Sequence, residues 1–69
     1  MNRYLIVIEK AQNNLAAYSP DLPGCVATGA TRQEVEDRMR EAIQMHIDGM
    51  KEDGLEIPEP SSVAEYIEA

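Results

Sequence analysis

The sequence predicts a small α+β domain in which three antiparallel strands precede one helix and a short final strand. Three short apolar runs occur within the first 29 residues, and turn-forming residues separate them, as is typical of strands joined by tight connections. From residue 31 the apolar residues recur at helical spacing instead. With 69 residues the chain can hold one domain, residues 1–69, with a thin hydrophobic core.

The first two strands are expected at residues 4–8 and 15–18. Residues 4–8 are rich in β-branched and aromatic side chains, which favour strands. The polar residues 12–14 interrupt the apolar pattern and predict a turn. Because the two runs are so close in sequence, an antiparallel hairpin is the simplest arrangement.

A proline-rich turn leads into the third strand, which is expected at residues 25–29. Pro23 and Gly24 are adjacent, and this pair suits a type II turn, in which proline sets the first φ and glycine supplies a positive second φ.

The helix is expected to begin after Thr31 and to end at Gly54. Thr31 and Glu34 have the spacing of a capping box, which satisfies amides at a helix start. Glycine is common just after a helix end. Seven residues form one apolar stripe along the segment: Val35, Met39, Ala42, Ile43, His46, Ile47 and Met50.

The end of the chain is less regular. Residues 55–60 contain two prolines and are expected to be an extended linker. Residues 63–67 fit either a short last strand or a frayed helical turn, so the expected element order is β-β-β-α-β.

Composition excludes several classes of function. One cysteine and one histidine provide neither an internal disulfide nor a four-ligand zinc site, so no metal or cofactor is expected. A net charge of −7 argues against binding nucleic acid or an anionic membrane. The longest apolar run is too short for a membrane span. We therefore expect a soluble, cytoplasmic protein.

Self-association is expected from the first strand. Its side chains are apolar on both alternating faces, and one helix can cover only one face of a sheet. A second copy would cover the other face, which carries Leu5 and Val7, so we expect a dimer or tetramer.

The helix carries acids on the side opposite its apolar stripe. At about 100° per residue, this side holds Asp37, Glu41, Gln44, Asp48 and Glu52. Like charges four residues apart cost roughly 0.2–0.5 kcal/mol per pair, and acids oppose the dipole at a helix C-terminus. Favourable pairs are expected only on the flanks, Glu34 with Arg38 and Glu36 with Arg40. The acidic side is either a solvated surface or a docking surface for a basic partner.

No catalytic residues are expected. Metal-dependent nucleases need several converging carboxylates, whereas Glu9 and Asp21 lie at a strand end and in a turn. Ser19, Asp21 and His46 have the residue types of a hydrolase triad, but a triad is defined by geometry.

The proline-flanked turn entering a capped helix resembles the HicB-like antitoxin family. The likeness rests on residues 18–25, Gly29, Thr31 and Glu34, and extends from the first predicted strand to Pro60. It implies a partial ribonuclease H-like fold and a HicA-like, RNA-cleaving toxin as the partner. Asp21 and Leu22 in the turn are further expected contacts.

Many family members continue into a DNA-binding domain that does not appear in this sequence, so direct nucleic-acid binding is not expected. The alternative is a stand-alone structural or small-ligand-binding oligomeric domain, in which residues 20–25 line a pocket.

Overall fold

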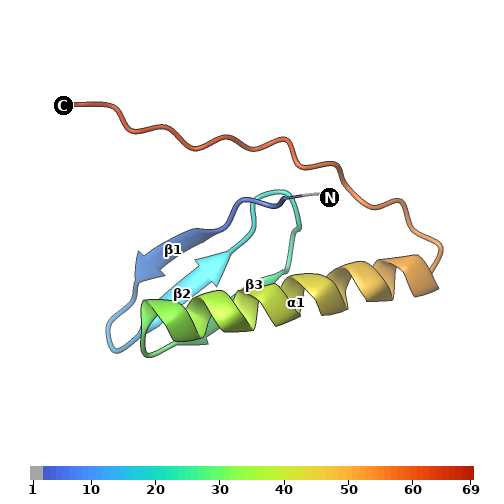
Figure 1. Cartoon of the computed structure of the whole chain (residues 1–69), viewed down its shortest axis with the longest axis horizontal. Coiled ribbons are helices and arrows are strands. Elements are labelled where there is room, and N and C mark those ends of the chain that lie inside the picture. Colours follow the sequence, from blue (N-terminus) through green and yellow to red (C-terminus); the bar gives the residue numbers. More distant parts are fainter. Residues whose placement is uncertain (1–2) are drawn as a thin grey trace.

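The protein folds as a three-stranded antiparallel sheet with one helix packed on one face (Figure 1). The computed structural model describes residues 3–69. Its elements follow in the order β1 (Val7–Lys10), β2 (Leu15–Tyr18), β3 (Val26–Gly29) and α1 (Arg32–Glu52). The strands lie in the spatial order β1-β2-β3. The predicted α+β class, with three antiparallel strands before one helix, is confirmed.

β1 begins three residues later than the sequence predicts. Its pairing with β2 starts at Val7, opposite Tyr18, and ends at Lys10, opposite Leu15. Tyr18 is the last residue of β2, so residues 4–6 have no strand opposite them. The Ser19 hydroxyl instead donates a hydrogen bond to the Leu5 carbonyl over 3.0 Å. Strand propensity therefore located the apolar run correctly, but the length of its neighbour decided where pairing begins.

The turn between β2 and β3 has the predicted conformation at Pro23 and Gly24. Gly24 has a φ of +84°, and the Cys25 amide donates to the Leu22 carbonyl over 3.1 Å, as a type II turn requires. A preceding turn is closed by the Leu22 amide, which donates to the Ser19 carbonyl over 3.1 Å. The two successive turns bring Leu22 and Cys25 back toward the sheet, and both side chains are buried.

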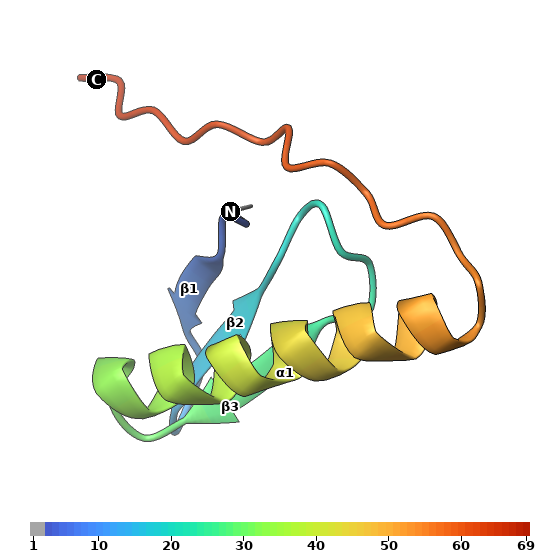
Figure 2. The same cartoon turned by 45° about the vertical axis from the view of Figure 1, so that its right-hand side comes forward.

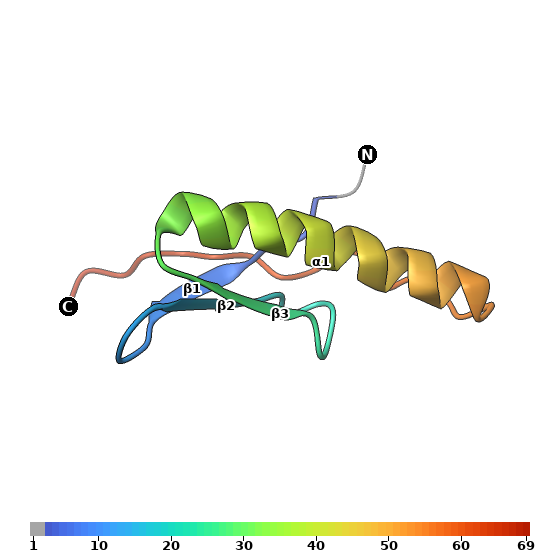
Figure 3. The same ribbon diagram turned by 90° about the horizontal axis from the view of Figure 1, so that it is seen from below.

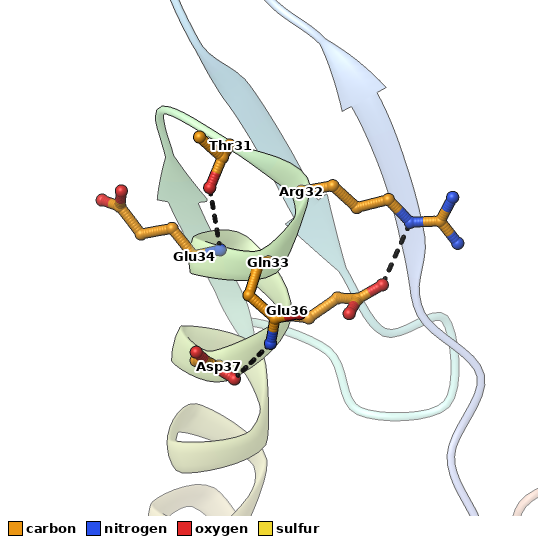
Figure 4. A network of polar contacts seen from close by, with 6 residues as sticks. All are labelled: Thr31, Arg32, Gln33, Glu34, Glu36 and Asp37. Atoms are coloured by element: carbon orange, nitrogen blue, oxygen red, sulfur yellow. Dashed lines mark hydrogen bonds and ion pairs between the residues drawn. The ribbon is translucent and has the colours of Figure 1, made fainter.

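The two ends of α1 lie where the capping residues predict them. Thr31 is the N-cap, and its hydroxyl accepts the Glu34 amide over 3.1 Å (Figure 4). At the other end Gly54 has a φ of +68°, the Gly54 amide bonds the Lys51 carbonyl, and the Leu55 amide bonds the Met50 carbonyl. This pair of bonds is a Schellman motif, which satisfies the last helical carbonyls.

The core lies between α1 and the sheet. α1 packs mainly on β3 and β2, and Figure 3 shows the helix and the sheet as two separate layers. Two helical residues of the predicted apolar stripe, Val35 and Met39, are fully buried. The core cluster contains Ala17, Leu22, Cys25, Val35 and Met39.

The segment after the helix returns along the β1 side of the molecule (Figures 1 and 2). It is anchored there by the Tyr4 hydroxyl, which donates to the Pro58 carbonyl over 2.6 Å. Residues 63–67 are neither strand nor helix among the described residues, so the predicted final strand is wrong. A strand requires backbone hydrogen bonds to a neighbouring edge, and the structure pairs β1 with β2 alone.

Within the described part of the chain, no helix is both long enough and apolar enough to cross a membrane.

Candidate functional site

The candidate site is the outer surface of α1, which we call the acidic helix face and define as Asp37, Glu41, Asp48 and Glu52. All four side chains are exposed, whereas Val35 and Met39 on the opposite side of the helix are buried. The amphipathic pattern thus places the carboxylates on the side of α1 that faces away from the sheet.

Local contacts compensate two of these four carboxylates, contrary to the expectation from the sequence. Asp37 accepts hydrogen bonds from Gln33 Nε2 at 3.0 Å and from Arg40 Nη1 at 3.1 Å, and Figure 4 shows the first of them. Asp48 accepts from Gln44 Nε2 at 3.0 Å. Side chains three or four residues away on a helix are within reach, so the repulsion between the acids is smaller than their spacing alone suggests.

The ion pairs at the start of α1 differ in part from the expected set. Arg38 pairs with Glu34 at 2.7 Å, as predicted. The predicted pair of Glu36 with Arg40 is wrong, because Glu36 pairs with Arg32 at 3.0 Å and Arg40 turns to Asp37. Figure 4 shows Arg32 reaching along the helix to Glu36. These pairs concentrate the mixed charges in the first half of α1.

Two carboxylates of the acidic helix face are unengaged within the part of the chain that the structure describes. Glu41 and Glu52 have no hydrogen bond or ion pair among the residues that the structure describes. Lys51 is the only Lys or Arg of the helix after Arg40. Two free carboxylates, with the partly satisfied Asp48 between them in sequence, therefore form an exposed anionic surface.

Asp21 holds the C-terminal segment to the turn between β2 and β3. Its two carboxylate oxygens accept hydrogen bonds from the backbone amides and hydroxyls of Ser61 and Ser62, at distances of 2.9–3.1 Å. The Ser62 amide and hydroxyl contribute most to a lowered pKa of the Asp21 carboxyl, and Ser61 adds to it, because these bonds favour the charged form. Asp21 was expected to contact a partner, and in the structure its oxygens are occupied within the chain.

Leu22, the second expected contact in the turn, is 0% exposed. Its side chain packs in the core with Val35 and Met39. A partner can reach the surrounding turn but not this side chain. We therefore leave Leu22 out of the candidate surface.

The Asp21 contact is expected to weaken in acid. The folded-state pKa lies below the ordinary value of 3.8, so the stabilisation is complete above that value and is lost as the pH falls through the lowered pKa. The protection factors of the Ser61 and Ser62 amides, which compare the observed exchange with the intrinsic rate at the same pH, should therefore fall at low pH. Asp21→Asn should show fast exchange at neutral pH as well. Slow exchange in Asp21→Asn would show that the carboxylate does not hold the segment.

The structure does not assemble the residues that could perform hydrolysis. The buried Ser19 hydroxyl bonds the Leu5 carbonyl, Asp21 bonds the two serines, and neither bonds His46 among the described residues. Cys25 is a free thiol, and burial raises its pKa, which disfavours the reactive thiolate. In residues 3–69 no group of three or more potential metal ligands is present.

Sequence reasoning missed the contacts that connect distant parts of the chain. Ser61 and Ser62 lie 40 and 41 residues from Asp21, and Tyr4 lies 54 residues from Pro58. A serine pair beside two prolines gives no signal of its partner, so these contacts needed the tertiary structure.

Comparisons with known proteins agree with this geometry. Residues 4–69 match the family model described as HicB_like antitoxin of bacterial toxin-antitoxin system. A chain of the solved HicA3 and HicB3 toxin-antitoxin complex superposes with a TM-score of 0.74 at 30% identity, covering 86% of this chain and 70% of that chain.

Three curated relatives are also similar. An uncharacterized 14.9 kDa protein of Haemophilus phage HP1 is 41% identical over 93% of this chain, which spans 48% of the phage protein. A UPF0150 protein of Helicobacter pylori is 37% identical, with 71% of this chain and 68% of the relative covered. A UPF0150 protein of Thermoplasma acidophilum is 32% identical, with 81% and 83% covered. The chain therefore belongs to the family of HicB-like antitoxins of bacterial toxin-antitoxin systems.

Proposed function

We propose that this protein neutralises a small, basic, HicA-like toxin by covering the surface with which the toxin binds RNA. The similarity to a chain of the HicA3 and HicB3 complex supports this kind of partner. The free carboxylates of the acidic helix face are the observation that carries the proposal, because carboxylates can occupy positions where a toxin would bind RNA phosphates. The protein acts by occlusion and not by chemistry, in the cytoplasm where the RNA lies.

The charge distribution of the chain supports docking through the helix. The net charge is −7, so the whole molecule attracts a cationic protein over distances of about a Debye length, roughly 8–10 Å at physiological salt. Glu41 and Glu52 can form ion pairs with a partner without first giving up contacts within the chain. The same charge disfavours direct binding of this protein to nucleic acid.

The competing proposal is a small-ligand-binding domain, and one feature of the structure favours it. A hollow of about 650 Å³ lies between the chain before β1 and the helix, with Arg3, Tyr4 and Ile6 on one side and Glu36, Met39, Arg40 and Ile43 on the other. It does not involve residues 20–25, which the sequence suggested as a pocket lining. Two charged side chains of the hollow are already engaged within the chain, Glu36 with Arg32 and Arg40 with Asp37, so the toxin-binding proposal has the stronger support.

Charge reversal on the helix tests the proposal. Glu41→Lys with Asp48→Lys should lower affinity for the HicA-like toxin by about tenfold or more, because like charges would then meet across the interface. Both positions are exposed, and a lysine at position 48 suits the dipole at the helix end, so the thermal melt should stay close to that of the wild type. Affinity of the wild type should also fall as salt rises.

A matched control separates local docking from total charge. Glu65→Lys with Glu68→Lys changes the net charge equally, but at exposed positions of the C-terminal segment. In an RNA-cleavage assay, wild-type protein and this control should inhibit the toxin, the helix variant should inhibit poorly, and wild-type protein alone should leave the RNA intact. Equal toxin affinity of the two folded variants would contradict docking through the acidic helix face.

A further inference from the structure

The sheet face opposite α1 is open, and its side chains form two rows across the strands. Side chains alternate between the faces of a strand, and Ile8, Ala17 and Ala27 belong to or pack against the core on the helix side. The neighbours of these residues therefore lie on the open face. The register gives one row of Val7, Tyr18 and Val26 and a second row of Glu9, Ala16 and Thr28.

The first row contains two exposed side chains, and the second row is hollowed at its centre. Tyr18 is 41% exposed and Val26 is 65% exposed. Next to them the small Ala16 leaves a hollow of about 390 Å³, whose lining also includes Tyr18, Thr28 and the oppositely charged Glu9 and Lys10. A cavity of about 150 Å³ already accommodates benzene, so the hollow has room for an aromatic ring. An exposed ring beside a hollow of this size allows the face to pair with a second copy of itself.

The distribution of charge decides which partner suits this face. Glu9 is the one charged residue of the six in the two rows, although the chain carries a net charge of −7. A second copy can therefore approach this face without bringing the two acidic helix faces together. A basic toxin, by contrast, would find little charge to pair with here.

We propose that a second copy of this chain docks on the open sheet face, with Tyr18 of each copy seated in the hollow over Ala16 of the other. The two copies are then related by a two-fold axis that lies between the two sheets. This axis is perpendicular to the strands and midway between the two rows. It places Glu9 opposite the partner's Val7, so the two carboxylates do not meet. The sequence predicted a homo-oligomer interface at Leu5 and Val7. The proposed interface keeps Val7, but it contains Tyr18 and Val26 in place of Leu5, which precedes β1.

The small size of the face limits how tightly two copies can bind. Three strands of four residues present roughly 14 by 14 Å, which is well below the area of about 800 Å² per partner in a standard interface. We therefore expect a weak, reversible dimer, as is typical of small, transient interfaces. Sedimentation equilibrium over a dilution series should show the transition from dimer to monomer.

Exchange of the ring and the hollow tests the geometry. Tyr18→Ala removes the ring, and Ala16→Tyr fills the hollow, so each variant alone should be monomeric across the concentration range in which the wild type dimerises. A mixture of the two variants should associate again, because the tyrosine at position 16 of one chain meets the alanine at position 18 of the other. The control Tyr66→Ala removes an equally large side chain that is fully exposed on the C-terminal segment, and it should dimerise like the wild type.

Circular dichroism would establish that the variants fold. Dimerisation of Tyr18→Ala at wild-type strength would overturn the proposal, as would failure of the mixed variants to associate when both are folded. Toxin inhibition reports separately on the proposed function. A folded, monomeric Tyr18→Ala that still inhibits the toxin would support two independent surfaces. Charge reversal on the acidic helix face should weaken toxin inhibition and leave dimerisation unchanged.

Discussion

Leu22→Ala is expected to lower the free energy of unfolding by about 2–5 kcal/mol. Leu22 is fully buried between the turn and the helix, and the alanine would leave a cavity as well as lose apolar burial. Free energies of unfolding of about 0.05–0.15 kcal/mol per residue are typical. In a chain of 69 residues the loss would therefore be a large fraction of the total stability. Urea denaturation followed by circular dichroism would measure the change.

Leu55→Ala is the matched control, because Leu55 is 56% exposed and its truncation should change stability by less than about 0.5 kcal/mol. The comparison also separates two roles of Leu22. If it acts only in the core, toxin inhibition should fall in proportion to the folded fraction. Full stability with selectively weakened inhibition would mean that Leu22 contacts the toxin after all.

Gly29→Ala is expected to destabilise the protein by about 1–3 kcal/mol, and Gly29→Val by more. A Cβ atom at this position would lie 3.0 Å from the backbone nitrogen of Val35 and 3.3 Å from the carbonyl carbon and Cβ of Glu34. The cause is close packing of β3 against the first turn of α1, since the φ of Gly29 is not in the left-handed region. Relief would require the strand and the helix to move apart.

Gly49→Ala is a control that should change the stability of the protein in the opposite direction. Gly49 lies within α1, and a Cβ atom there would meet nothing within 4 Å. Alanine should therefore stabilise the helix by up to about 1 kcal/mol. Thermal melts of the two alanine variants should move in opposite directions from the wild type. A rise in melting temperature for Gly29→Ala would show that β3 and α1 are not tightly packed.

The local elements could be predicted because their causes are local. Thr31 and Gly54 bound the helix through capping bonds to residues within five positions, and Pro23 with Gly24 sets its own turn geometry. The acidic helix face was also predictable, because helical periodicity alone decides which side chains share a side.

The ion pairs could be predicted only in part. Arg40 has Glu36 four residues away and Asp37 three residues away, and spacing does not decide between two acids that are both within reach. The structure pairs Arg40 with Asp37 and leaves Glu36 to Arg32. This choice changes which carboxylates of the candidate site remain free.

By itself, the sequence determined the succession of three strands and one helix, the caps of α1 and the two sides of the helix, since each depends on neighbours within a few residues. The tertiary structure alone decided that β1 starts at Val7, that Asp21 bonds Ser61 and Ser62, that Leu22 is buried, and that residues 63–67 form no strand. These outcomes depend on which distant segments meet, and residues 40 or more positions apart become neighbours only when the chain packs around its core.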